Sequence, residues 1–401
     1  MLKVKTKNYL LVLLLLFFSG NRLVSFLFSK YAPILGLVLV IILINKNFKI
    51  GKSYFKVIKI IAVFLLFITV TQYFQLGLVS VLGMINILIK FTMGGLIIHY
   101  LRDKFIPLFF KVTFHLSLLS LLFYLTISIL NIGLPAIELS DKINSYVFYG
   151  TATSHIAKNM GMFWEPGAYA GILTLCLALN LNNLTYYWKK QQFKLVIVIL
   201  TLITTQSTTG YIVGTVILFF VLYQTKKIGI YLFVLPVVIA IGVFVYQSNE
   251  FLKTKIEHQF ENASEQNVGE FSNTRFGSLL FDWHYIEKHP FTGNGMLTET
   301  RYADHQYLFV GATTDVVGSG NSFSHYWASF GIFFILGYFF LLKKAIDPFG
   351  KLFVILMLSV VFLNLQGEQW FNFPLYLGLI FINFKESTLS SNQNGIQIKK
   401  S

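Results

Sequence analysis

Long runs of apolar residues, separated by short links rich in Lys, Asn and Gly, make up most of the chain. A bilayer core about 30 Å thick needs roughly 20 apolar residues per crossing helix, and fewer where neighbouring helices shelter the ends. The pattern predicts about twelve membrane-spanning helices, at residues 9–20, 31–44, 57–74, 79–98, 108–130, 163–181, 195–205, 211–223, 228–246, 323–342, 352–365 and 371–384. The short runs 195–205 and 211–223 are also compatible with a re-entrant hairpin.

The fold class follows from the same pattern. Transmembrane barrels alternate polar and apolar positions along each strand, and this chain does not alternate over most of its length. The 401 residues are 55% hydrophobic and 12% charged, with a mean hydropathy of +0.66, whereas soluble domains carry about 25% charged residues. We therefore expect an all-α, polytopic membrane protein. The charged N-terminus and short apolar run resemble a signal peptide, but the many later runs favour an uncleaved first helix.

The net charge of +15 is concentrated in the links between apolar runs. If the N-terminus is cytoplasmic, nearly every basic link falls on the cytoplasmic side, as the positive-inside rule requires. This distribution predicts twelve spans with both ends cytoplasmic, and it argues against a nucleic-acid-binding protein. The expected units are helices over 1–246, an outer loop over 247–322, helices over 323–384 and a cytoplasmic tail over 385–401.

Four polar segments are expected on the outer face. They are "MFWEPGAYAG" at 162–171, "TTQSTTG" at 204–210, the loop 247–322 and "QGEQWFN" at 366–372. Loops longer than about 12–15 residues are usually functional or disordered. Because polar groups from several helices converge on one face, we expect a site at the membrane–water boundary.

Glu165 stands close to the apolar core, directly before Pro166. One interpretation is an interfacial helix N-cap, since Pro suits the first helical turn and acidic groups favour the positive end of the helix dipole. The other is a catalytic or sugar-binding carboxylate. Glu368, beside Trp370, is similarly either a buried acid of the site or an interfacial anchor. Trp164, which precedes Glu165, is a candidate to pack on a sugar face, although an interfacial aromatic belt is an equally good explanation.

Two arginines in the long loop are candidates to bind an anion, because a guanidinium fits phosphate oxygens. Arg275 follows Asn273 and Thr274 in a loop otherwise poor in cations. The alternative for Arg275 is an ion pair with a loop carboxylate. Arg301 is flanked by Glu299 and Asp304, so a structural salt bridge is the favoured interpretation there.

The remaining candidates are weaker. His289 precedes Pro290 and is either a base or the end of a helix, and His325 lies on the same face. Thr209 is either a substrate contact or part of a helix cap.

Metal-ligand spacing is absent from the sequence, and the single Cys176 allows neither an intrachain disulfide nor a thiolate cluster. No nucleotide-binding or acyl-serine motif occurs either, so we expect no metal and no cofactor.

Taken together, "EPG", "STTG", "NTRFGSLLFDWHYIEKHPFTGNG" and "GNSFSHYWASFGIFFILGYF" resemble the O-antigen polymerase and ligase superfamily, with the Wzy-type polysaccharide polymerases as the closer match. The resemblance runs from about residue 160 to 337. It implies a GT-C-type glycosyltransferase of the bacterial inner membrane. Its substrates would be a polyprenyl-diphosphate-linked oligosaccharide donor and acceptor, met on the outer face of the bilayer, and a chain-length regulator is a further expected partner.

The resemblance also assigns roles. It implies that Arg275 serves the donor diphosphate, whereas the arginine expected near the sixth span is not evident in the sequence. Many relatives, ligases especially, carry a catalytic His before an Asn. Gly320 stands at that place here, before Asn321, which leaves Asn321 as a substrate-binding candidate. This departure favours a polymerase over a ligase and leaves the base open among Glu165, His289 and His325. A lipid-linked oligosaccharide transporter is disfavoured, because no half of the chain repeats.

Overall fold

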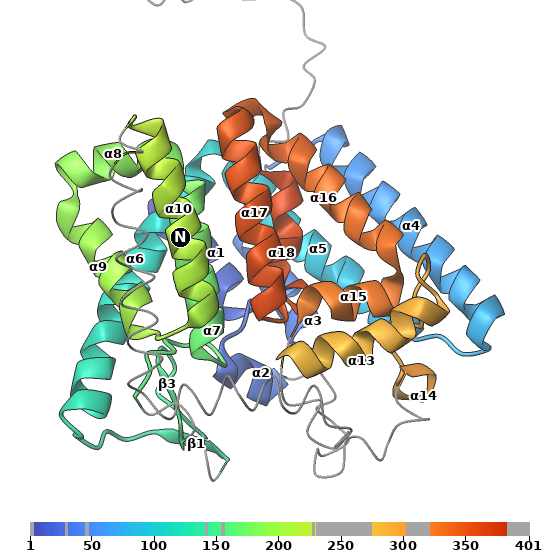
Figure 1. The fold of residues 1–401 in the computed structure, drawn as a ribbon, viewed down its shortest axis with the longest axis horizontal. Coiled ribbons are helices and arrows are strands. Elements are labelled where there is room, and N and C mark those ends of the chain that lie inside the picture. Colours follow the sequence, from blue (N-terminus) through green and yellow to red (C-terminus); the bar gives the residue numbers. More distant parts are fainter. Residues whose placement is uncertain are drawn as a thin grey trace, which may run out of the picture.

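The computed structural model describes residues 4–28, 31–44, 48–140, 143–153, 157–226, 229, 275–301 and 321–382. Most of these residues are helical (Figure 1). The helices before the long loop are α1 (Val4–Phe17), α2 (Arg22–Phe28), α3 (Ala32–Leu43), α4 (Lys52–Leu76), α5 (Val81–Leu101), α6 (Phe105–Phe123), α7 (Pro166–Leu179), α8 (Leu181–Lys190), α9 (Gln192–Thr204) and α10 (Thr208–Gln224). Those after it are α13 (Arg275–Lys288), α14 (Thr298–Arg301), α15 (Ser322–Phe330), α16 (Ile332–Ile346), α17 (Lys351–Gly367) and α18 (Pro374–Gly378).

Local sequence signals set several helix ends. The Ser80 hydroxyl accepts a hydrogen bond from the backbone N–H of Gly83 at the start of α5, as preferred N-cap residues do. Pro166 and Pro374 occupy the first turns of α7 and α18, where a missing N–H costs nothing. Gly77 ends α4 in a left-handed conformation. The ends of these helices therefore follow from single residues.

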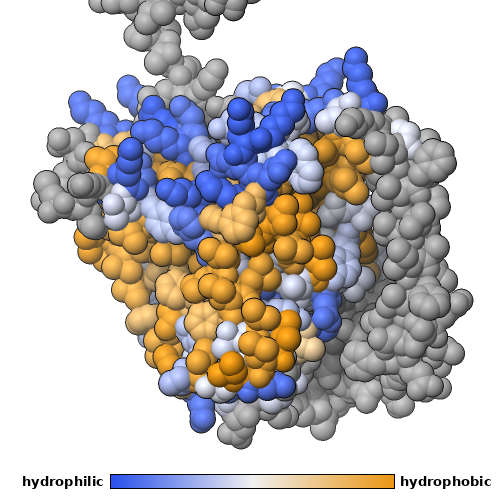
Figure 2. Space-filling view, turned by 90° about the vertical axis from the view of Figure 1, so that its left-hand side faces the viewer, coloured by the Kyte–Doolittle hydropathy of each residue, from blue (hydrophilic) through white to orange (hydrophobic). Residues whose placement is uncertain are grey.

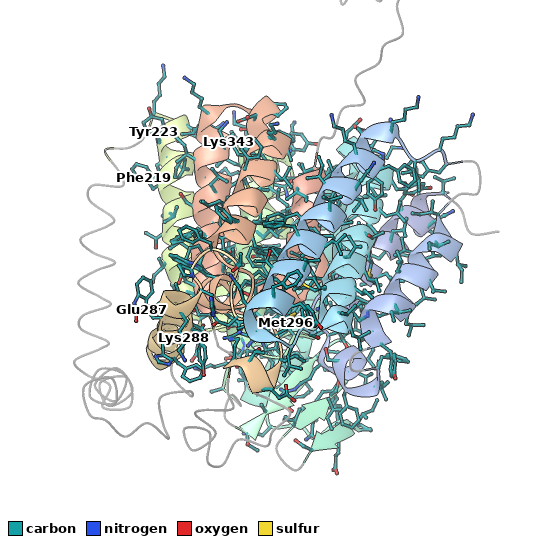
Figure 3. All side chains as sticks on the ribbon, turned by 90° about the vertical axis from the view of Figure 1, so that its right-hand side faces the viewer. Phe219, Tyr223, Glu287, Lys288, Met296 and Lys343 are labelled. Atoms are coloured by element: carbon teal, nitrogen blue, oxygen red, sulfur yellow. The ribbon has the colours of Figure 1, made fainter. Side chains whose placement is uncertain are left out.

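Apolar helices indicate a membrane protein. By length and composition alone, two described helical stretches could cross a bilayer, Lys52–Leu76 and Val81–Ile129, and up to four could if two bent helix pairs each count as one span. In Figure 2, hydrophilic residues gather at one end of the molecule, above a broad hydrophobic surface. Exposed apolar patches of this size mark a surface in contact with something other than water. Figure 3 shows Lys343 at one end of the bundle, opposite Glu287 and Lys288.

Several predicted spans differ from the observed helices. The predicted span 163–181 begins at Pro166 and bends by 89° into α8, a helix that the hydropathy pattern did not predict. The predicted span 323–342 is wrong as a single helix, because α15 ends at Phe330 and α16 begins at Ile332. The predicted run 371–384 forms short pieces, namely the 3-10 turn Trp370–Asn372, α18 and the 3-10 turn Leu379–Phe381.

The long loop corresponds to α13 and α14 where the structure describes it. The predicted span 228–246, apart from residue 229, lies outside the described residues, and so do most of 247–320 and the expected tail 385–401.

The expectation of an all-α fold is wrong for the segment between α6 and α7. Residues there form a small antiparallel sheet, with strand order β1 (Ile137–Ser140), β2 (Ile143–Ser145) and β3 (Gly150–Ala152). In its register Ile143 is opposite Ala152, and Ile137 is opposite Ser145. Strands of three or four residues carry too little alternation to stand out in a sequence dominated by apolar helices.

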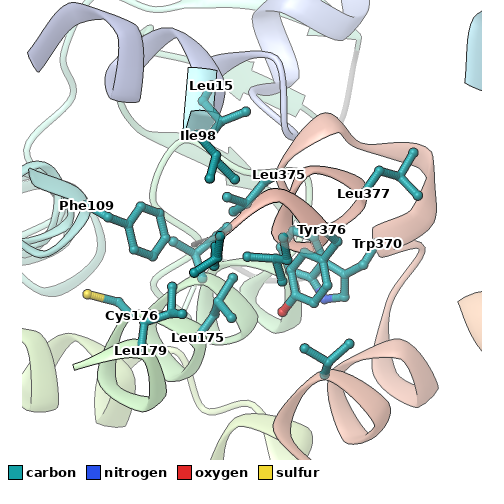
Figure 4. Packing of buried hydrophobic residues seen from close by; sticks show 14 of the residues in the cluster. Leu15, Ile98, Phe109, Leu175, Cys176, Leu179, Trp370, Leu375, Tyr376 and Leu377 are labelled. Carbon is teal, nitrogen blue, oxygen red and sulfur yellow. The ribbon is translucent and has the colours of Figure 1, made fainter. Parts of the chain in front are cut away.

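The core centres on α7 and α18 (Figure 4). Trp370 is fully buried and stacks on Tyr376, with ring centroids 4.5 Å apart. The Tyr376 hydroxyl donates to the carbonyl of Gly171 in α7 (3.3 Å), and the Tyr338 hydroxyl donates to the carbonyl of Tyr376 (2.7 Å). Buried hydroxyls with partners avoid the cost of an unsatisfied polar group. These contacts fix α18 and its preceding turn against α7 and α16.

Gly331 lies at the break between α15 and α16, and a substitution there tests why one helix does not continue into the other. Its φ is +77°, and a Cβ there would lie 1.9 Å from the Phe291 carbonyl oxygen. We expect Gly331→Ala to lower the free energy of unfolding by about 2 kcal/mol or more, because both the backbone conformation and the contact exclude a side chain. Unfolding of the purified protein in detergent measures this effect.

Gly337→Ala in α16 is the matched control, because no atom lies within 4 Å of a Cβ built there. We expect that change to stay within about 1 kcal/mol of wild type. Equal effects of the two substitutions would contradict the role assigned to Gly331.

Candidate functional site

Four polar segments meet at one end of the helical bundle. They are the residues before α7, the start of α10, the start of α15 and the residues that follow α17. We call residues 366–376, from the last turn of α17 into α18, the C-terminal turn. Contacts from each of the other three segments reach this turn. The predicted convergence of polar segments is therefore confirmed for the parts that the structure describes.

Trp164 and Glu368 join the first segment to the C-terminal turn. The indole N–H of Trp164 donates to Oε2 of Glu368 (3.1 Å), whose side chain is 4% exposed. Trp164 also stacks on Phe373, with centroids 4.5 Å apart, and meets the edge of Trp370 at 5.4 Å. Phe373 thus covers one face of the Trp164 ring. Glu368 is a buried acid of this region, and one of its contacts positions an aromatic side chain.

Glu165 occupies the N-cap position of α7, with extended backbone angles (φ −147°, ψ 156°) and Pro166 following it. Its backbone carbonyl accepts from the N–H of Tyr169 (3.2 Å). Its carboxylate makes no capping hydrogen bond. The N-cap interpretation is correct for the backbone and wrong for the side chain. The Glu165 side chain is half-buried, and the residue before it in the sequence is Trp164.

Thr209, in the first turn of α10, packs against the last turn of α17. A Cβ added at Gly367 would lie 2.7 Å from the methyl group of Thr209. The cap of α10 is Ser207, whose hydroxyl accepts from the Gly210 N–H (3.2 Å). The helix-cap interpretation of "STTG" is therefore confirmed for Ser207. Thr209 itself lies next to the C-terminal turn, and its role as a substrate contact stays a prediction.

Asn321 ties α15 to the C-terminal turn. Its Oδ1 accepts from the Ser324 N–H (3.1 Å), which caps α15, and its Nδ2 donates to Oε1 of Gln366 (2.7 Å). The next residue, Ser322, accepts from the backbone N–H of Phe371 through its hydroxyl (3.2 Å). The Tyr326 hydroxyl donates to this turn as well, within reach of the Phe371 carbonyl (3.0 Å) and Oδ1 of Asn372 (2.8 Å).

Arg301 forms a buried ion pair with Asp282 of α13, as the structural interpretation predicted, while the flanking Asp304 lies outside the described residues. Its Nη2 lies 2.7 Å from Oδ1 of Asp282, with side chains 1% and 0% exposed. Its Nη1 donates to the Ser329 hydroxyl at 2.6 Å, and the guanidinium lies over the Tyr285 ring. These contacts connect α13, α14 and α15. The described contacts of Arg301 join helices of the protein to one another. A direct role of Arg301 in substrate binding stays a prediction.

His325 belongs to the same buried network. Its Nδ1 lies 3.3 Å from Nη1 of Arg301. A guanidinium has only N–H donors, so Nδ1 is the acceptor and the proton of the neutral ring resides on Nε2. In this arrangement His325 offers a donor, not an acceptor, at its second nitrogen. A general base must accept a proton, so His325 is a weaker candidate for the base than Glu165.

Helices α13 and α15 run side by side in the same direction, which places Arg275 and His289 at opposite ends. Oδ2 of Asp282 accepts from the Ser324 hydroxyl (2.6 Å), and the Ile332 N–H donates to the Pro290 carbonyl (2.8 Å). Arg275 precedes Asp282 by seven positions, and His289 follows Asp282 by seven, a rise of about 10 Å in each direction.

The first residue of α13, Arg275, therefore lies toward the Asn321 end of α15 and the C-terminal turn (Figure 1). His289 lies at the far end, near α4, where the neighbouring Thr292 donates to Gln75 (2.9 Å). The structure does not bring His289 to the polar segments around Glu165. For Arg275 the backbone position agrees with the predicted site.

Arg22, at the start of α2, was missed by the sequence analysis. Its backbone N–H donates to the carbonyl of Met162 (3.2 Å), and Asn21 forms an isolated bridge with Phe163. These bonds hold it next to the segment that carries Trp164 and Glu165, and its charge interacts with that of Glu165. One signal was available: Arg22 is a cation in a link that the predicted topology places on the outer face, where cations are scarce.

Part of the chain is similar to a known protein family. Residues 193–339 match the family model described as O-Antigen ligase. The matched part runs from α9 into α16 and includes Thr209, Arg275 and Asn321. Trp164, Glu165, Glu368 and Arg22 lie outside it. A search of curated proteins finds no match to this chain.

The buried ion pair between Arg301 and Asp282 allows a test of its structural role. Breaking such a pair by neutralising one partner costs about 3–5 kcal/mol, because the other charge stays buried without its counter-ion. We expect Arg301→Gln to lower the free energy of unfolding by this amount in detergent. Arg301→Gln combined with Asp282→Asn should cost less than the sum of the single changes.

Lys343→Gln is the matched control, because the Lys343–Asp347 pair is exposed (54% and 46%) and exposed pairs contribute at most about 1 kcal/mol. A stable Arg301→Gln protein that has lost only substrate binding would contradict the structural role.

Proposed function

Because the match over residues 193–339 supports membership of the O-antigen polymerase and ligase superfamily, we propose that the chain is a polysaccharide polymerase. It would transfer a growing glycan from its polyprenyl diphosphate to a hydroxyl of a new lipid-linked repeat. The observation that carries this proposal is the meeting of Trp164, Glu368, Thr209 and the Asn321 end of α15 at one end of an apolar bundle. That end would receive a substrate with a lipid tail and a polar head.

Glu165 is our candidate for the general base. Its carboxylate does not cap α7, whereas Nδ1 of His325 already accepts from Arg301 and His289 lies at the other end of α13. In the proposed step Glu165 accepts the proton of the acceptor hydroxyl, whose oxygen forms a bond to the anomeric carbon of the donor sugar. The bond from that carbon to the diphosphate oxygen breaks, and its electron pair leaves with polyprenyl diphosphate. A positioned base contributes about 10²–10⁴-fold.

The leaving diphosphate develops negative charge, which a positioned cation would stabilise. Arg275 is the proposed cation, since it begins α13 at the end nearest the C-terminal turn. Removing one preorganised contact of this kind typically costs about 2.7–4 kcal/mol in the barrier. Because the diphosphate is already an activated leaving group, the reaction needs no ATP. Trp164 and Glu368 would shape the sugar-binding surface, with Asn321 and Thr209 as polar contacts.

We further propose the membrane arrangement that this chemistry requires. The chain would cross the bacterial inner membrane about twelve times, with both ends in the cytoplasm and the site end on the outer face. The basic residues Lys189, Lys190, Lys343 and Lys344 would then face the cytoplasm, as the positive-inside rule favours. The bilayer would hold the two polyprenyl tails, and a chain-length regulator is a further proposed partner.

A ligase that transfers the glycan to a lipid or protein acceptor is the second candidate. The printed description of the matched family, O-Antigen ligase, favours it. The sequence favours the polymerase, because Gly320 stands where many ligases carry a His before the Asn at 321. The two enzymes differ in the acceptor, so the length of the lipid-linked product separates them.

The polymerase proposal predicts a specific pair of defects. In a strain that lacks its own polymerase but makes the native lipid-linked repeat, wild type should build long chains. Arg275→Ala should leave mainly single repeats, because the leaving group is no longer stabilised, and Glu165→Gln should lower the rate about 10²-fold or more. Glycan length on gels, at matched protein levels in the membrane, is the measurement.

Lys288→Ala and Glu287→Gln are the matched controls, since both residues are exposed near the other end of α13. These variants should build chains of wild-type length. Single repeats with wild type itself would overturn the polymerase proposal. Transfer of single repeats to a separate lipid or protein acceptor would favour the ligase.

A further inference from the structure

Arg22 reaches the candidate site from the opposite end of the sequence. The chain leaves α1 at Phe17 and passes through Gly20, where φ is +127° and a Cβ would lie 2.1 Å from the Trp164 ring. Only glycine allows this close approach without displacing the indole. The Asn21 amide then donates to the Val147 carbonyl (2.7 Å), and the bridge from Asn21 to Phe163 fixes the backbone. These contacts set Arg22 beside the start of α7.

The guanidinium of Arg22 has donors that nothing in the described structure uses. Its Nη1 atom is buried without a hydrogen-bond partner. Among the described residues no ion pair or hydrogen bond to the guanidinium is found within the usual distances, although Arg22 and Glu165 are close enough for their charges to interact. A buried donor of a charged group without an acceptor is unfavourable, and such a group in a native structure calls for a partner.

The geometry points to an anion as that partner. A guanidinium presents several N–H donors in one plane, which suits the oxygens of a phosphate group. The adjacent groups are those already assigned to the proposed reaction, namely Glu165 and the Trp164–Glu368 pair. The charge interaction with Glu165 leaves the Nη1 donor without a partner. An acceptor oxygen between Arg22 and this region would satisfy the buried atom.

We propose that Arg22 binds the diphosphate of a polyprenyl-diphosphate lipid next to Glu165. The proposal rests on the polymerase function and extends its site to the first outer link of the chain, outside the family match at 193–339. Arg22 then holds the diphosphate near the carboxylate that accepts the proton. The chain would thus use two cations for its lipid diphosphates, with Arg275 approaching from the long loop and Arg22 from the N-terminal helices.

Binding can be measured without turnover. Full-length protein in detergent is titrated with radiolabelled polyprenyl diphosphate that carries no glycan, and with polyprenyl alcohol of the same chain length. We expect Arg22→Gln to raise the Kd for the diphosphate at least tenfold and to leave the Kd for the alcohol unchanged. Arg22→Lys, which keeps the charge but loses the planar donors, should lie between the two. Lys343→Gln, at the other end of the bundle, is the control and should bind as wild type does.

The Kd of the Glu165→Gln variant for the diphosphate is an independent test, because it does not require an Arg22 variant to fold. Removing a negative charge beside the bound diphosphate should tighten its binding several-fold. Phosphatidylglycerol, a membrane lipid with one anionic phosphate, serves as the competing probe. It should displace the diphosphate poorly from wild type if the site recognises the diphosphate rather than any anionic headgroup.

The proposal is overturned if Arg22→Gln binds the diphosphate as wild type does, or if it weakens the alcohol equally. Equal displacement by phosphatidylglycerol would also overturn it, in favour of a general lipid-headgroup contact. These outcomes are separate from the polymerase test. Arg22-dependent binding by a protein that builds no chains would contradict the polymerase alone. Full chain growth with unchanged binding by Arg22→Gln would contradict only the role of Arg22.

Discussion

The candidate site depends on the way the C-terminal turn, residues 366–376, is held. Asn321 binds Gln366, Ser322 binds the Phe371 backbone, and Trp164 binds Glu368. On the inner side the Ser19 hydroxyl accepts from the Leu375 N–H (3.0 Å), so the end of α1 is joined to the same turn. Buried Trp370 anchors the turn by stacking on Tyr376. Because segments from both ends of the sequence bind here, a change in this turn would affect Trp164, Asn321 and Ser322 together.

The polar groups at this end follow two different physical rules. The charges of Arg301 and Asp282 are fully buried and pair with each other, and they also contact Ser329 and Ser324, so they connect α13, α14 and α15. Arg22 is only half-buried, and its Nη1 atom has no hydrogen-bond partner. A buried network in which each charge has a partner rigidifies a fold, whereas donors held in place without a partner are suited to a ligand. This contrast separates the supporting residues from the proposed reacting ones.

The sequence predicted the helical class and the convergence of the polar segments, because long apolar runs and charged links are strong local signals. It did not predict the bend between α7 and α8 or the break at Gly331, since both depend on contacts with distant segments such as Phe291. The three short strands were missed for lack of alternation. The flanking acids suggested a salt bridge for Arg301, but the sequence did not indicate Asp282 in a neighbouring helix as its partner. Arg22 lies more than 100 residues from Glu165 in the sequence, and only the folded backbone brings the two together.

The central claim is that this bundle joins lipid-linked glycans at the end that carries Glu165 and the C-terminal turn. The most direct measurement supplies the purified protein, in lipid nanodiscs, with its native polyprenyl-diphosphate-linked repeat and no other protein or nucleotide. The account predicts a ladder of longer lipid-linked glycans, with one polyprenyl diphosphate released for each new glycosidic bond. Release of polyprenyl diphosphate without longer lipid-linked products, or no reaction with the authentic repeat, would contradict it.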